Sequence, residues 1–243
     1  MKVIVKNSEK WVFPKEWLEA LKAEFHRQLP SRKIWLIIED KRQQDYTIRI
    51  NGDCGRIVVR VSTCIDVKDE IISIFKKGYL KAVVEHEVKH LQPNVRFWLN
   101  EIIPPYIIRD TQSKSFCEDL YRLLNLKFQD FLTDVYANSG MTIEGLKKYL
   151  EFETSKICSM WDDMNKVGTV KIPLMLFTSY IEACYTAIGE YPSNELHSIN
   201  MHLQDDNSNV SIYKQMVEVY LEMWKAVKSG QIDIDLTKSK PCR

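Results

Sequence analysis

The residues best suited to chemistry lie in one short stretch, HEVKH, at positions 86–90. On a helix, two histidines four residues apart share a side, so His86 and His90 can each direct an imidazole nitrogen at one zinc ion. The intervening Glu87 then reaches a water molecule on the metal and can act as its general base. Because the metal lowers the pKa of that water to about 7, a nucleophile is available at neutral pH. The spacing therefore predicts a hydrolytic site with one zinc ion per chain.

The residues around this stretch predict the helix that carries it. Apolar residues recur at helical spacing through 79–91 and form one side of the helix. Lys81, Glu85 and Lys89 recur every four residues on another face, which indicates a charged stripe in contact with water. Glu87 falls among the apolar positions instead, where a carboxylate is costly unless a charge compensates for it. A metal ion with its water would supply that compensation.

The HEVKH stretch resembles the active-site motif of the zincin metallopeptidases. After His90 the chain continues LQPNVRFWLN, without the glycine and third histidine of the extended metzincin motif. The similarity is therefore to the gluzincin-like group. In that group an acidic residue on a later helix completes the ligands, and an acid four residues further on often steadies the first histidine.

The later helix that fits this pattern is expected at 118–138. It carries Asp130 and Asp134 four residues apart, so both project from one side. Together with Asn125 they look like the arrangement in small, uncharacterised prokaryotic HExxH proteins. This resemblance implies Asp130 as the third zinc ligand and Asp134 as the residue that orients His86.

Two alternatives to this assignment stay open. In the first, Glu118 takes the place of Asp130 as ligand, with Glu101 as the next choice. In the second, the two aspartates belong to an ordinary solvated face, because Lys127 and Asn138 project from the same side of the helix.

The zincin resemblance has two further implications. The segment RIVVRVS at 56–62 precedes the motif helix, and in zincins a strand at this place forms the upper rim of the cleft and pairs with an extended substrate. Further along, His197 and His202 lie in NELHSINMH, which we interpret as a Ser/Asn-rich connection. Some gluzincins place a histidine or tyrosine there to stabilise the oxyanion. For both histidines we favour the other interpretation, a position on the surface.

The wider sequence predicts an α+β protein. WVFPKEWLEALKAEFHRQL at 11–29 has helical spacing, and KIWLIIE, YTIRI and RIVVRVS are typical of strands. From about residue 66 nearly every segment indicates a helix, with breaks at Pro, Gly and Asn/Ser clusters. The core stripe of the last helix is expected to contain Tyr213, Met216, Tyr220 and Met223. The predicted helical segments after the strands are 66–92, 112–138, 141–157, 170–188 and 208–229.

These elements predict a zincin-like arrangement in two parts. A small, mostly antiparallel N-terminal sheet with helices would form the catalytic region at 1–140. Within it, the active-site helix is expected at about 76–92 and the helix of the third ligand at about 112–138. A helical subdomain would follow at 141–243.

Composition limits the partners and the compartment. Of 243 residues, 34 are basic and 33 acidic, and the net charge of +1 gives no reason to expect nucleic acid or a membrane surface as partner. The N-terminal apolar run is interrupted by Lys6 and Glu9, unlike a signal peptide, and no run approaches the roughly 20 residues that span a bilayer. The six scattered cysteines indicate thiols in a reducing cytoplasm, with a Cys54–Cys64 disulfide as the open alternative.

The sequence as a whole predicts a cytoplasmic zinc metallopeptidase, a hydrolase whose substrate is a peptide or protein. One alternative is a non-enzymatic helical interaction or regulatory protein, in which the HEVKH site is decayed or binds metal for structure only. Another is a latent zincin that its own C-terminal helices keep inactive. Composition and motifs do not predict the oligomeric state.

Overall fold

The computed structural model describes residues 1–6, 11–41, 46–53, 55–91, 131, 133–164, 171–204 and 207–229. These residues fall into two compact units. The first contains those within Met1–Asn94 and Gly140–Phe152, and the second those within Val95–Ser139 and Glu153–Asp235. The α+β class predicted from the sequence is confirmed.

The first unit is built on a four-stranded sheet with the order β1-β2-β4-β3. β1 and β2 are parallel, β2 and β4 are parallel, and only β3 and β4 are antiparallel. The sheet is therefore mixed, and the expectation of a mostly antiparallel sheet is wrong. The strands are β1 (Lys2–Lys6), β2 (Ile34–Glu39), β3 (Ile48–Asp53) and β4 (Arg56–Ser62).

The parallel pairing follows from a strand that the sequence reading did not assign. KVIVK forms β1, and the helix α1 (Lys15–Gln28) then connects it to β2. A helical crossover returns the chain to the end of the sheet where it started, so the strands on either side of it run in the same direction. The short β3–β4 connection at Gly55 gives the antiparallel pair.

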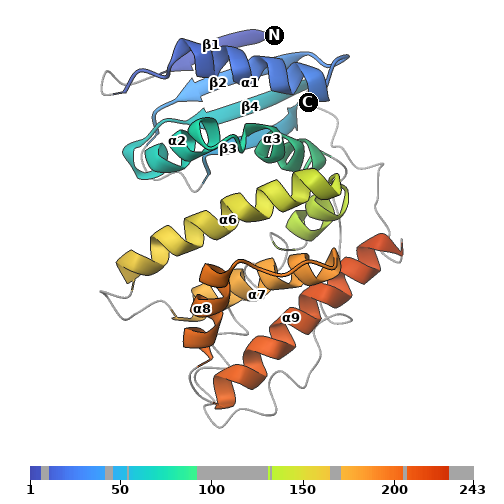
Figure 1. Ribbon diagram of the computed structural model, residues 1–243. Helices are drawn as coiled ribbons and strands as arrows, with labels where there is room; N and C mark the ends of the chain where they lie inside the picture. Colours follow the sequence, from blue (N-terminus) through green and yellow to red (C-terminus); the bar gives the residue numbers. More distant parts are fainter. Residues whose placement is uncertain are drawn as a thin grey trace. The chain divides into compact units, whose positions relative to one another are not determined.

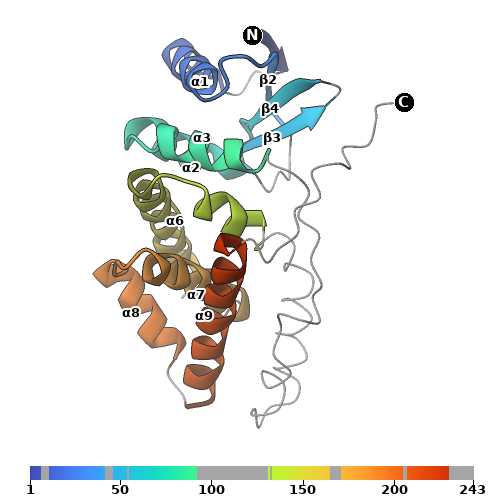
Figure 2. The ribbon, with the colours of Figure 1, turned by 90° about the vertical axis from the view of Figure 1, so that its right-hand side faces the viewer.

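Three helices of the first unit lie on one side of this sheet (Figure 2). They are α1, α2 (Lys68–Lys76) and α3 (Leu80–Lys89), and the first part of α6 (Ile143–Met164) also belongs to this unit. Alternate strand residues face them, because side chains along a strand point to opposite faces. Leu36 and Val59 are fully buried cross-strand neighbours, and they share one core with Leu21 of α1 and Val84 of α3. This core fixes α3, the helix that carries the HEVKH stretch.

β4 lies inside the sheet, between β2 and β3. Both of its edges are engaged in pairing, since β2 occupies one side and β3 the other. An extended peptide adds only to an open edge of a sheet. The expectation that a substrate pairs with Arg56–Ser62 is therefore wrong.

The predicted helical segment 66–92 consists of two helices separated at Gly78. The Tyr79 N–H donates to the Ile74 carbonyl at 3.0 Å, and Lys77 N–H donates to Ser73 at 3.0 Å, which ends α2. Gly78 has a φ of 78°, the left-handed conformation common just after a helix end. This turn starts α3 in a new direction, with Tyr79 as its N-cap residue.

The Gly78→Ala variant is expected to lower the free energy of unfolding by about 1–2 kcal/mol, because an L side chain is strained at this φ. The matched control is Gly52→Ala. An added Cβ meets nothing within 4 Å at either glycine, but only Gly78 has a positive φ. The control should change stability by no more than about 0.5 kcal/mol in chemical denaturation. Equal effects of the two variants would contradict this account of the turn.

Helices dominate the second unit (Figure 1). The stripe predicted for the last helix is confirmed, because Tyr213, Met216, Tyr220 and Met223 are all at most 1% exposed. Tyr220 packs edge-on against Tyr180 of α7, with ring centroids 5.4 Å apart. The helices labelled in this unit are α7 (Lys171–Ala187), α8 (Asn194–Leu203) and α9 (Asn207–Lys228), with the later part of α6 (Ile143–Met164). The described residues 131 and 133–139 are helical as well.

α8 corrects the interpretation of NELHSINMH as a connection. Ser193 caps this helix, since its hydroxyl accepts a hydrogen bond from the Leu196 N–H at 3.3 Å. Leu196, Ile199 and Leu203 form its buried side. A serine cap with this apolar spacing marks a helix start, which the polar composition obscured. Among the described residues, no helix is both long and apolar enough to cross a membrane.

Candidate metal centre

The two histidines of HEVKH face each other at the end of α3. Their Nε2 atoms lie 2.8 Å apart, and the rings meet edge-on with centroids at 4.5 Å. His86 is buried and only 3% exposed, whereas His90 is half-buried. Two imidazole ligands of one tetrahedral zinc ion, each bound at 2.0–2.1 Å, have nitrogens about 3.3 Å apart. The pair therefore converges on one point, at close to the spacing that a single ion requires.

The C-terminal end of α3 keeps the two histidines at helical spacing, and its partial charge favours a bound cation. His90 follows the last residue of α3 but keeps a helical φ of −63°, and its N–H donates to the carbonyls of His86 and Glu87. The four-residue relation of the two rings is therefore intact. A helix C-terminus carries partial negative charge, which favours a cation bound beside it.

The acidic residues that the sequence assigned to the site are described only in part. Asp134 is half-buried, and it belongs to the second unit, whereas both histidines belong to the first. Its predicted role of orienting His86 therefore stays a prediction. Asp130, the predicted third ligand, lies outside the described residues. So do Asn125, Lys127 and the alternative ligands Glu101 and Glu118.

The helical residues around Asp134 are packed within the second unit. Val135 and Ala137 are at most 1% exposed. Asn138 is also 1% exposed, and its amide donates to the Tyr180 hydroxyl and to Cys184 Sγ. Of the face that the alternative interpretation places in water, the structure describes Asp134, which is half-buried, and Asn138, which is buried.

Glu87 and Glu85 differ in surroundings although they lie on the same helix. Glu87, the predicted general base, is half-buried. Glu85 was expected on a solvated stripe but is only 6% exposed, so that expectation is wrong. Its carboxylate accepts hydrogen bonds from the Thr142 N–H at 2.7 Å and from the Thr142 hydroxyl at 3.3 Å. The spacing of the charged residues predicted a solvated face, because it gives no information about the later segment that covers Glu85. That segment is the start of α6.

One neighbour of the site was missed by the sequence reading. The ring of Tyr149 on α6 is stacked on His86, with centroids 4.0 Å apart and planes 12° from parallel. Tyr149 lies more than fifty positions after His86, and no motif links the two positions. A single sequence holds no signal for this contact.

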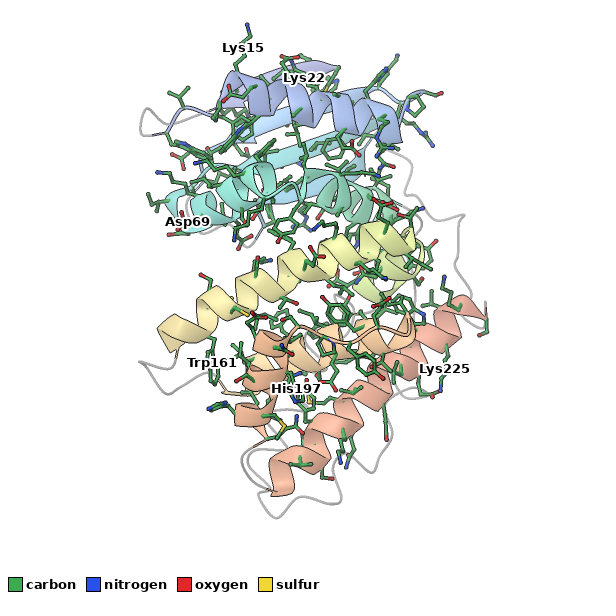
Figure 3. The ribbon with its side chains drawn as sticks, viewed as in Figure 1. Lys15, Lys22, Asp69, Trp161, His197 and Lys225 are labelled. Atoms are coloured by element: carbon green, nitrogen blue, oxygen red, sulfur yellow. The ribbon has the colours of Figure 1, made fainter. Side chains whose placement is uncertain are left out.

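The two downstream histidines are surface residues, as favoured from the sequence. His197 and His202 are both exposed on α8, and Figure 3 labels His197 there. The ring of His202 meets Trp161 edge-on at 6.0 Å, and its Nδ1 lies 2.9 Å from the Ser198 carbonyl oxygen. Local packing accounts for both of these contacts.

The thiols of the described cysteines include one, Cys184, that is deeply buried. Cys64, Cys158 and Cys184 carry thiols, so the alternative Cys54–Cys64 disulfide is not formed. Burial raises the pKa of the Cys184 thiol to about 12, and its hydrogen bonds with Tyr180 and Asn138 only partly offset this. Since the thiolate is the reactive form, Cys184 is inert at neutral pH.

Comparisons with protein-family models, with curated proteins and with solved structures found no match for this chain. The zincin resemblance therefore rests on two short sequence motifs, HEVKH and the pattern of Asn125, Asp130 and Asp134, and stays a prediction. What the structure offers is a pair of histidines whose ring nitrogens converge at the end of α3.

Proposed function

We propose that the protein is a zinc-dependent peptidase in which His86 and His90 bind one zinc ion, with Asp130 as the third ligand that the zincin resemblance implies. The observation that supports it is the convergence of the two imidazoles, whose Nε2 atoms lie 2.8 Å apart. The order of residues in HEVKH adds a carboxylate, Glu87, next to the first ligand in the chain.

The type and number of donors favour a catalytic site over a structural one. Two imidazoles and one carboxylate form a set that catalytic zinc sites use, with the fourth position left for water or substrate. Structural zinc sites are closed by four protein ligands, mostly cysteine and histidine. The two described ligands of the proposed site are histidines, and the third ligand that the resemblance implies is a carboxylate.

The chain's residues would divide the chemistry as follows. A bound zinc ion lowers the pKa of a water molecule that it holds. Glu87 takes a proton from the attacking water and passes it to the leaving nitrogen of the peptide. His86, His90 and Asp130 would hold the metal, and Asp134 would orient His86. The fourth position on the metal would be left for water or substrate. The choice of a peptide as substrate comes from the resemblance to zincins, because HExxH with an open position is the arrangement that those peptidases use.

Peptide cleavage that depends on metal tests this function. The full chain, loaded with one equivalent of zinc, is expected to cleave members of a mixed peptide library. Treatment with a chelator should abolish cleavage, and zinc should restore it. A zinc-loaded protein that cleaves no peptide would contradict the peptidase assignment. Cleavage that appears only after limited proteolysis would instead identify the latent form.

A further inference from the structure

The start of α6 is held by a capping arrangement that is divided between two helices. Thr142 precedes α6, and its hydroxyl accepts a hydrogen bond from the Gly145 N–H at 3.1 Å. In an ordinary capping box, a glutamate or glutamine at this third helical position returns a hydrogen bond to the N–H of the cap residue. Here that position is a glycine, and Glu85 of α3 accepts from the Thr142 N–H instead.

The glycine at position 145 makes room for this substitute. A Cβ atom on Gly145 would collide with Glu85 Oε2 and approach the Thr142 hydroxyl. The Glu85 carboxylate therefore occupies the space of the missing side chain. Its negative charge also lies at the N-terminus of α6, where the helix dipole favours an anion. These contacts explain why a glutamate directly before a candidate metal ligand is buried.

The same face of α6 reaches the candidate ligand His86. Gly145, Tyr149 and Phe152 are spaced at i, i+4 and i+7, so they share one side of the helix. Gly145 adjoins Glu85, the Tyr149 ring is stacked on His86, and Phe152 contacts Tyr79 with centroids 5.5 Å apart. The first turns of α6 thus run along α3 in the opposite direction.

We propose that Glu85 and Tyr149 are positioning residues of the metal centre. The divided capping box fixes the first turn of α6, and Tyr149 then holds the His86 ring so that its Nε2 faces that of His90. An imidazole ring rotates about two bonds, and a parallel aromatic neighbour at 4.0 Å restricts both rotations. This inference rests on the proposed function, in which His86 binds zinc.

The test compares Tyr149→Leu, which removes the ring, with Tyr149→Phe, which retains it. The dissociation constant for zinc is measured on the full chain by competition with a chromophoric chelator, and the visible spectrum of the cobalt-loaded protein reports ligand geometry. Tyr149→Leu is expected to raise the dissociation constant about 10–100-fold, as for other residues that orient a ligand, and to change the cobalt spectrum. Tyr149→Phe should match the parent in both measurements.

A second variant tests the capping arrangement itself. Gly145→Ala displaces the Glu85 carboxylate. The zinc dissociation constant should therefore rise, although neither the histidines nor the stacked tyrosine have been replaced. It also serves as the test if Tyr149→Leu does not fold. Variants that lower only the melting temperature of the metal-free protein, with zinc affinity and cobalt spectrum as in the parent, would overturn the inference. If the parent chain binds no zinc, the proposed function itself fails, which is a separate outcome.

Discussion

Replacing Glu87 with glutamine is expected to lower kcat/KM for peptide hydrolysis by about 10²–10⁴-fold, while the chain keeps its zinc. Glutamine has nearly the same shape as glutamate but cannot accept a proton from water. Because Glu87 is not one of the proposed ligands, metal binding should be unaffected. Cleavage kinetics and zinc content are measured on the same preparation.

The matched control for this variant is Glu144→Gln, the same chemical change at an exposed position in the first turn of α6. It should hydrolyse the peptide at the parent rate. If Glu87→Gln cleaves as fast as this control, Glu87 is not the base. Loss of zinc in Glu87→Gln would mean that Glu87 itself is needed to hold the metal.

Removing the carboxylate of Asp130 is the second change with a large expected effect. As the proposed third ligand, Asp130 would supply one of three protein bonds to the metal, so Asp130→Ala should raise the zinc dissociation constant more than 100-fold. A residue that only orients a ligand typically changes metal affinity 10–100-fold. The size of the effect therefore distinguishes a ligand from an orienting residue, which is the role that the sequence predicted for Asp134.

Asp134→Ala is the informative companion, since the sequence predicted that Asp134 orients His86. We expect it to raise the dissociation constant by only about 10–100-fold. A larger loss in Asp134→Ala than in Asp130→Ala would reverse the two assignments. Far-UV circular dichroism of both variants without metal shows whether either change alters the helical content.

The site's local part could be predicted because it depends on helical spacing alone. His86 and His90 are one helical turn apart, and α3 places their nitrogens 2.8 Å from each other as the spacing indicated. The stripe of α9 was predictable for the same reason, since Tyr213 and Tyr220 repeat at the helical period and are buried.

Contacts between distant segments could not be predicted in this way. Glu85 was expected to be solvated because its own helix shows only a charged spacing, yet Thr142 covers it. The stacking of Tyr149 on His86 likewise depends on how α6 returns to α3. Periodicity indicates which side of a helix is apolar, but it does not indicate which later segment packs there.

The error in the sheet had a different origin. KVIVK is only five residues long with lysine at both ends, so it was considered only as a possible targeting segment and not as a strand. Without β1, the connection through α1 had no first strand, and the parallel pair of β1 and β2 could not be inferred. A short edge strand with charged ends is common at the border of a sheet.

Zinc content tests the central claim most directly. Elemental analysis of protein purified without a histidine tag is compared for the parent, Glu87→Gln and His90→Ala. The proposed site predicts about one zinc per chain in the parent and in Glu87→Gln, and loss of zinc in His90→Ala. A parent chain that contains no zinc, even after incubation with the metal, would contradict the metal centre and leave HEVKH as an ordinary part of α3.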